Sequence, residues 1–236
     1  MRRIRLFLLP LLLGGTMPIA AQVGYDPGTS PFRDIRTGTA WEIYGGSIKG
    51  SGGPIPVGPR DGPYLGVRAL LRAKNTVSIG FGVWNAFTER TVLDPTVTPS
   101  AREVGVRDAH LLAGEVTLQF NLTGGKQWHR FAPFAGVGLG FVKNTSGDDG
   151  DPGGYAFGSK FYFAPMVGAR LFAAERLYLR AEARGFTWKV SYPPSYSIEP
   201  ADDPGTAESP NAINPLGRGS QYVFAPALSL GIGFAF

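Results

Sequence analysis

The last sixteen residues of the chain, 221–236, alternate between two kinds of side chain. From Tyr222 to Phe236 the even positions carry large apolar residues, with Pro226 as the interruption, and the odd positions from Ala225 onward carry only Ala, Ser or Gly. A period of two is typical of a β-strand with two unlike faces. Because neither face is charged, the strand suits a narrow barrel in lipid, with bulky residues facing acyl chains and small residues facing a crowded lumen.

The amino-terminal segment 1–21 predicts export. Three arginines within the first five residues precede an apolar run over 6–13, and small residues at 18–21 offer a cleavage site. This order is that of a secretory signal peptide. An uncleaved membrane anchor is the alternative, but the run is too short to span a bilayer and Pro10 interrupts it. We therefore expect a cleaved signal peptide.

Composition excludes several function classes. The chain has no cysteine, which rules out disulfides, a lipoprotein anchor and thiolate metal sites. The net charge of +5 includes three arginines in 1–21, where no acidic residue lies, so removing that segment leaves +2. The sequence also has no basic stripe with interleaved aromatic residues, and we expect no nucleic-acid partner.

The chain from 39 to 236 divides into eight segments of period two. Short turns follow the second, fourth and sixth segments, and longer connections follow the others, at 50–62, 88–105, 143–157 and 191–219. This regular asymmetry is typical of a barrel with both termini in the periplasm. The sequence therefore predicts an all-β fold: an eight-stranded antiparallel transmembrane β-barrel over 39–236, with short periplasmic turns and long extracellular loops.

Two parts of the chain depart from this rhythm. Residues 22–38 have no period and contain two prolines, so we expect a periplasmic arm there. In the seventh segment, Phe186, Trp188 and Val190 share the parity of the charged Arg184. A β-bulge near Gly185 would turn these residues toward lipid. We therefore assign Trp188 to an aromatic girdle on the extracellular side.

Several segments carry a resemblance to a known family. The stretches PFAGVGLGF at 133–141, FAPMVGARLF at 163–172 and LYLRAEARG at 177–185 resemble the strand repeats of small outer-membrane β-barrels. They are similar to the membrane domain of outer membrane protein A and to outer membrane protein W. The resemblance implies the outer membrane of a double-membraned bacterium, with outer-membrane lipid and the barrel-assembly machinery as partners. It also implies that Phe234 and Phe236 form the membrane-assembly signal.

Charged residues on the small faces are the candidate site of the lumen. Exposure to lipid near the bilayer centre would cost roughly 2–4 kcal/mol for each arginine, which fixes their inward phase. Eight strands leave an interior that side chains can fill, so we predict a plug of Arg/Glu pairs. The alternative is a gate in which Arg68 or Arg180 exchanges partners with Glu115. The predicted lumen charges are Glu42, Arg68, Arg72, Glu115, Arg170, Arg180, Glu182 and Arg184.

The expected function is non-enzymatic: envelope structure, or surface binding in which extracellular ligands contact loops 143–157 and 191–219. A narrow channel for small or hydrophobic solutes is the first alternative. A lipid-modifying enzyme is the second, with His110 beside Asp108 as its candidate residues. A soluble lipid-binding barrel is disfavoured because it would expose nearly all its large apolar residues to water.

We expect neither a cofactor nor a metal. The glycines at 136, 138 and 140 are not followed by a helix, so they do not form a nucleotide-binding motif. Asp148, Asp149 and Asp151 could offer oxygen ligands to a divalent cation, but their spacing fits no calcium loop. A solvated acidic loop is the expectation.

Overall fold

The computed structural model describes residues 29–35, 38–147 and 150–236. The chain divides into two units, 1–31 and 32–236, and the second contains the whole barrel. The predicted signal peptide, and the portions 22–28 and 36–37 of the predicted arm, lie outside the described residues.

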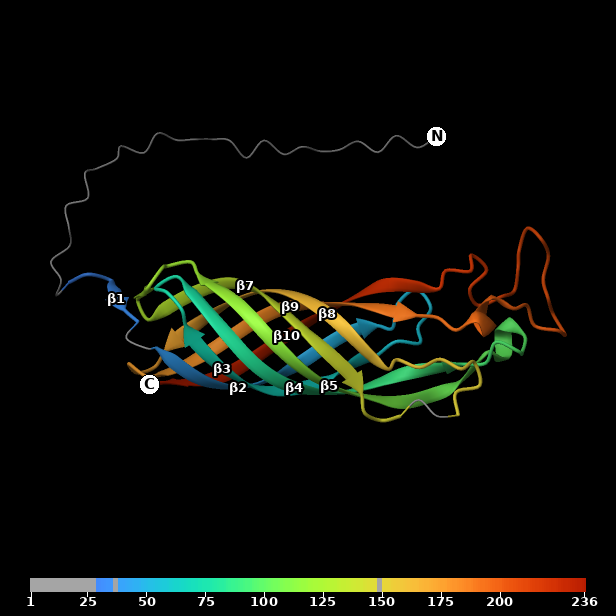
Figure 1. The fold of residues 1–236 in the computed structure, drawn as a ribbon, viewed down its shortest axis with the longest axis horizontal. Helices are drawn as coiled ribbons and strands as arrows, with labels where there is room; N and C mark the ends of the chain where they lie inside the picture. Colours follow the sequence, from blue (N-terminus) through green and yellow to red (C-terminus); the bar gives the residue numbers. More distant parts are fainter. Residues whose placement is uncertain (1–28, 36–37, 148–149) are drawn as a thin grey trace, which may run out of the picture. The chain divides into compact units, whose positions relative to one another are not determined.

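Eight long antiparallel strands form one closed barrel, as the sequence predicted (Figure 1). Each pairs with its neighbour along the chain, and the last pairs with the first to close the ring. No helix among residues 29–35, 38–147 and 150–236 is long and apolar enough to cross a membrane. The strands are β2 (Thr39–Ser51), β3 (Arg60–Arg72), β4 (Val77–Leu93), β5 (Glu103–Asn121), β7 (Phe131–Asn144), β8 (Ser159–Phe172), β9 (Leu177–Ser191) and β10 (Ser220–Ala235).

The alternation of side chains separates the outside of the barrel from its lumen. On β2 and β10, Ile43 and Leu230 are 70% and 71% exposed, whereas Glu42 and Ser229 on the opposite faces are buried. Such a surface would be insoluble in water and suits lipid. Exposed aromatic residues form a girdle at each end of this band: Phe120, Phe131, Phe234 and Phe236 near the short turns, and Phe87, Phe141, Phe161 and Tyr222 near the long loops.

The predicted bulge in β9 is wrong. The pairing of β9 with β10 runs without a register shift from Leu177 to Ser191. Phe186 and Trp188 therefore continue the inward phase of Arg184, and both are fully buried. They pack in an apolar layer of the lumen, so their parity needs no correction. Trp188 does not belong to the extracellular girdle.

The predicted loop 88–105 is mostly strand. The β4·β5 ladder continues to the pair of Leu93 with Glu103, which leaves only 94–102 as the connection. That connection contains the short 3₁₀ helix η1 (Pro99–Ala101). The inward face of the extension remains buried at Thr88 and Arg90, which explains why the ladder does not fray above the membrane.

Two short strands lie at the end with the short turns. β6 (Lys126–Trp128) forms a small hairpin with β7, and β1 (Phe32–Asp34) pairs with β6. Ile35 follows β1 and is buried at this mouth of the barrel. Its carbonyl accepts a hydrogen bond from the guanidinium of Arg72. The chain entering the barrel is thus attached to the connection between β5 and β7.

Candidate functional site: the charged lumen

Five strands direct charged side chains into the middle of the lumen. Glu42 on β2 lies directly opposite Arg68 on β3. Glu115 on β5 lies between Gly82 of β4 and Gly140 of β7, which leave space beside it. A side chain at Gly82 would meet the Glu115 side chain at 3.4 Å. Small residues on one strand therefore make room for long charged residues on the next.

Glu182 is the most highly connected carboxylate of this group. It accepts hydrogen bonds from Arg68 at 3.3 Å, from Nε of Arg180 at 3.0 Å and from Nε of Arg184 at 2.6 Å. Arg180 and Arg184 lie two residues away on the same face of β9, so each contacts one oxygen of the carboxylate. All four side chains are buried. Removal of this one carboxylate would leave three guanidinium groups with fewer partners.

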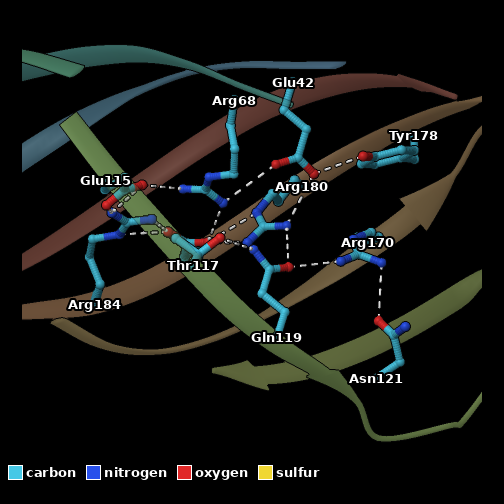
Figure 2. Close-up of polar contacts among 11 residues, drawn as sticks. Glu42, Arg68, Glu115, Thr117, Gln119, Asn121, Arg170, Tyr178, Arg180 and Arg184 are labelled. Atoms are coloured by element: carbon cyan, nitrogen blue, oxygen red, sulfur yellow. Dashed lines mark hydrogen bonds and ion pairs between the residues drawn. The ribbon is translucent and has the colours of Figure 1, made fainter. Parts of the chain in front are cut away.

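Glu115 and Glu42 complete the network (Figure 2). Glu115 accepts from Arg184 at 2.9 Å, from Arg68 at 3.3 Å and from the Tyr162 hydroxyl at 3.0 Å. Glu42 accepts from Arg180 at 3.1 Å, from Arg68 at 3.4 Å and from the Tyr178 hydroxyl at 2.7 Å. Arg68 therefore bridges all three carboxylates.

Arg170 is held by neutral partners instead of a carboxylate. Its guanidinium donates to Gln119 at 2.9 Å and to Asn121 at 3.1 Å, and it lies 5.2 Å from the ring centre of Phe134. Arg180 stacks on the same ring at 3.9 Å. The lumen site predicted from the sequence contained only charged residues, so Gln119, Asn121 and Phe134 were not part of it. The signal was present, because Gln119 and Asn121 share the parity of Glu115.

Arg72 does not join the network, although it was predicted among the lumen charges. It is the last residue of β3, and its guanidinium donates to the carbonyls of Ile35, Asn75 and Gly125. The other seven predicted residues are buried together in the lumen. Position 72 lies beyond the last inward layer, so its side chain serves the mouth of the barrel.

An aromatic layer fills the lumen on the side of the long loops. Tyr64, Trp84, Tyr162 and Phe186 pack with ring centres 4.9 to 6.3 Å apart. The indole of Trp84 donates to the Tyr162 hydroxyl at 2.8 Å, and that hydroxyl donates to Glu115. This contact joins the aromatic layer to the charged layer beneath it.

The extracellular connections form a cap over the aromatic layer. Arg90 of β4 and Asp151 of the 145–158 connection form a buried ion pair at 2.7 Å. Ser195, in the short 3₁₀ helix η2 (Pro194–Ser197), donates to the carbonyl of Gly153 at 2.5 Å. Buried aromatic residues from both connections fill the space beneath: Tyr155, Phe157, Tyr192 and Tyr196.

The acidic loop residues do not gather around a metal in the described part of the chain. Asp151 is occupied by Arg90 and by the backbone N–H groups of Gly153 and Tyr155. Asp148 and Asp149 lie outside the described residues. Among residues 29–35, 38–147 and 150–236, no cluster of three or more His, Cys, Asp or Glu side chains could hold a metal ion.

At the opposite end, a cavity of about 30 Å³ lies between the charged layer and the mouth. Its lining includes Arg170, Asn121 and Tyr178, which contact the charged layer, and Ile35 and Arg72, which lie at the mouth. This volume holds roughly two or three water molecules, because a single probe sphere occupies about 10–15 Å³. It is too small for an organic solute.

Two other predicted sites lie on the outside of the barrel. Phe234 and Phe236 are exposed beside each other at the end of β10, with ring centres 5.2 Å apart. His110 is on the outward face of β5, and its ring lies 5.3 Å from that of Phe87. Its backbone N–H donates a hydrogen bond to the hydroxyl of Ser146 at 2.8 Å.

Comparison with known proteins gives structural matches only. No protein-family model matches the chain, and no curated protein matches it by sequence. Among solved structures, it is similar to Neisserial surface protein A, with 13% identity, a TM-score of 0.49, and coverage of 88% of this chain and 98% of that one.

A second similar structure is the outer membrane protein OprG from Pseudomonas aeruginosa, with 12% identity, a TM-score of 0.45, and coverage of 85% of this chain and 97% of that one. A third is Ail, the attachment invasion locus protein of Yersinia pestis, in complex with the heparin analogue sucrose octasulfate. It has 14% identity, a TM-score of 0.36, and coverage of 85% of this chain and 99% of that one.

Proposed function

We propose that this chain is an integral outer-membrane β-barrel, that it is non-enzymatic, that its lumen is closed, and that its function is carried by the extracellular cap. The observation that carries the closed lumen is the buried network around Glu182, Glu115 and Glu42. Four arginines and three glutamates fill the barrel at mid-height, and the aromatic layer covers them. A water-filled path would need both layers to separate.

The energetics of the network favour a permanent plug. Buried charges cost several kcal/mol each to desolvate, and only close pairing with further hydrogen bonds offsets that cost. Each of the three carboxylates accepts from at least two arginines, and two of them accept from a tyrosine as well. Opening a path would break several of these contacts at once. The network thus supports a scaffold role for the barrel wall and its filling.

The cap supports surface binding. Its interior is fixed by the Arg90–Asp151 pair and by buried aromatic residues, so the outer surface of the loops has a defined shape. Within 191–219, Ile198 and Leu216 are 65% and 73% exposed. Exposed apolar residues on an ordered loop above a membrane suit contact with another surface. We propose loops 143–157 and 191–219 as the region that extracellular ligands contact.

The remaining partners follow from the membrane location. Outer-membrane lipid contacts the apolar band, and the barrel-assembly machinery reads the end of β10. We propose Phe234 and Phe236 as that assembly signal, because both rings are exposed on the last strand, which closes the barrel against β2.

A narrow channel is the second candidate, and one feature favours it. Arg68 shares its guanidinium among three carboxylates at 3.3 to 3.4 Å, which are longer contacts than those of Arg184 with Glu115. A side chain with several similar partners could exchange them as a gate. Planar-bilayer recording of the mature chain separates the two functions.

We expect the refolded wild-type barrel to insert without discrete conductance steps. Glu115→Ala removes a partner of Arg68 and Arg184, and should create openings or destabilise the barrel. Asp61→Asn, which removes an exposed ion pair with Lys49, is the matched control and should remain silent. If the wild type shows discrete openings that change with Glu115→Ala, the proposal of a closed scaffold is wrong and the channel function takes its place.

A further inference from the structure

One glycine on the lipid-facing wall has no packing reason to be glycine. Gly114 of β5 faces outward, and an added Cβ would meet no atom within 4 Å. In contrast, a Cβ at the inward Gly140 would clash with the backbone at 2.3 Å. The outward Gly185 is covered by the ring of Phe224, which lies 2.1 Å from its added Cβ. Gly114 alone among these three leaves an open notch.

The notch lies in an apolar groove of about 740 Å³ on the outside of the barrel. The groove follows a row of paired residues across the strands. From β3 to β8 the successive cross-strand partners are Val67, Val83, Gly114, Phe141 and Phe161. A glycine inside a strand weakens the strand and often marks the close approach of a ligand. Here the approach can come only from the membrane side.

The length and direction of the groove fit a lipid tail. Four inter-strand steps of ~4.8 Å give a row roughly 19 Å long, and one leaflet of the hydrocarbon core is about 15 Å thick. The strands run obliquely around the barrel, so a row across them climbs along the barrel axis (Figure 1). The row starts in the interior of β3 and reaches the extracellular end of β8 at Phe161.

Two exposed lysines stand at the extracellular end of this row: Lys143 on β7, and Lys189, which follows the Tyr162–Trp188 pair on β9 and so lies beside Phe161. Lys143 is exposed on the outward face of β7, two residues beyond Phe141. Residues two apart on a strand lie roughly 7 Å apart on the same face. A lipid whose tail contacts Phe141 and Gly114 therefore brings its headgroup beside the Lys143 ammonium. That ammonium favours a headgroup with a net negative charge over a zwitterionic one.

We propose that the groove over Gly114 is a binding site for one outer-leaflet lipid with an anionic headgroup. The tail lies along the Val83, Gly114 and Phe141 row, and Lys143 binds the headgroup. This inference rests on the position of the barrel in the membrane and not on whether the lumen conducts. It differs from the general lipid contact of the apolar band because it names one site with a shape and a charge.

Native mass spectrometry of the refolded barrel in detergent tests the site, with dimyristoyl phosphatidylglycerol and dimyristoyl phosphatidylcholine as probes. We expect the wild type to retain one phosphatidylglycerol. Gly114→Leu should weaken the binding of both lipids by about tenfold, because its side chain occupies the place of roughly two tail methylene groups. Gly114→Ala should bind lipid more weakly than the wild type but more tightly than Gly114→Leu. Both variants should fold, because a Cβ at this position meets open space.

The headgroup is tested separately. Lys143→Gln should weaken phosphatidylglycerol binding by about fivefold and leave phosphatidylcholine unchanged, as expected for one lysine near an anionic surface. Lys49→Gln is the matched control, since Lys49 is exposed near the extracellular end of β2 and lies outside the groove. Equal loss with Lys49→Gln, unchanged lipid binding with Gly114→Leu, or a wild-type dimer abolished by Gly114→Leu would each overturn the proposal.

Discussion

The charged layer and the aromatic layer fill the same lumen by different physics. Around Glu182, every contact is directional, and each buried group depends on partners from other strands. Around Phe186, rings pack edge to face or tilted at 4.9 to 6.2 Å, and few hydrogen bonds are involved. Substitutions that preserve shape should therefore be tolerated in the aromatic layer and rejected in the charged layer.

The largest effect should follow from Glu182→Gln, which keeps the size of the side chain and removes its charge. Three buried arginines lose a carboxylate partner, and breaking such a network costs about 3–5 kcal/mol. Urea unfolding of the refolded barrel in detergent, followed by tryptophan fluorescence, measures the free energy of unfolding. A loss no larger than that of the shape-preserving substitution Phe186→Leu in the aromatic layer would remove the distinction between the layers.

A smaller effect is expected from Asp151→Asn in the cap. The amide keeps an oxygen for the backbone N–H groups of Gly153 and Tyr155 but weakens the buried pair with Arg90. We expect a cost of about 2–3 kcal/mol, mostly as local opening of the 145–158 connection. Limited proteolysis of the inserted barrel reports this opening. Unchanged cleavage would show that the cap does not depend on the ion pair.

In the aromatic layer, Phe186→Leu should cost only about 1–1.5 kcal/mol, because the substitution keeps an apolar side chain of similar size. The same urea titration used for Glu182→Gln gives a direct comparison. Phe186→Ala serves as the control that creates a cavity, and should cost about 3–5 kcal/mol. An equal cost for Leu and Ala would mean that ring geometry, and not volume, holds this layer.

The smallest effect concerns pH and Tyr196 in the cap. Burial raises the pKa of the Tyr196 hydroxyl, and the nearby Asp151 raises that pKa further. The folded cap therefore favours the neutral hydroxyl, so stability is fully present below the ordinary tyrosine pKa of about 10 and falls as the pH rises above it. Above about pH 10, cleavage of 191–219 by an alkali-stable protease should therefore increase. In Tyr196→Phe this increase should be smaller, and an identical pH profile would exclude Tyr196 as its source.

The sequence predicted the barrel and its charged residues because both depend on strong penalties. An outward Arg180 or Arg184 would face lipid, and an inward Leu228 or Leu230 would not fit opposite its neighbours, so parity alone determines the face. Aromatic parity was harder to interpret. Trp188 is acceptable both in a girdle and in the lumen, and its burial depends on loop residues such as Phe157, 6.0 Å away in the fold. Local sequence does not contain that contact.

Two further features depended on contacts far apart in the chain. Arg72 has the same parity as Arg68, and only the carbonyls of Ile35 and Gly125 draw it to the mouth. The extension of β4 and β5 contains short polar stretches that resemble a loop in sequence. Its strand conformation depends on cross-strand pairs such as Arg90 with Arg107, and on the cap packed against its inner face.

The β4·β5 extension determines how far the exposed loops stand from the bilayer. β5 has 19 residues, about eight more than the 9–11 that a tilted strand needs to cross the membrane, which at ~3.3 Å each adds roughly 25 Å along the strand. The two strands thus act as a rigid pillar for the neighbouring connections. A surface raised on such a pillar can reach partners that lie beyond the headgroup layer of the bilayer.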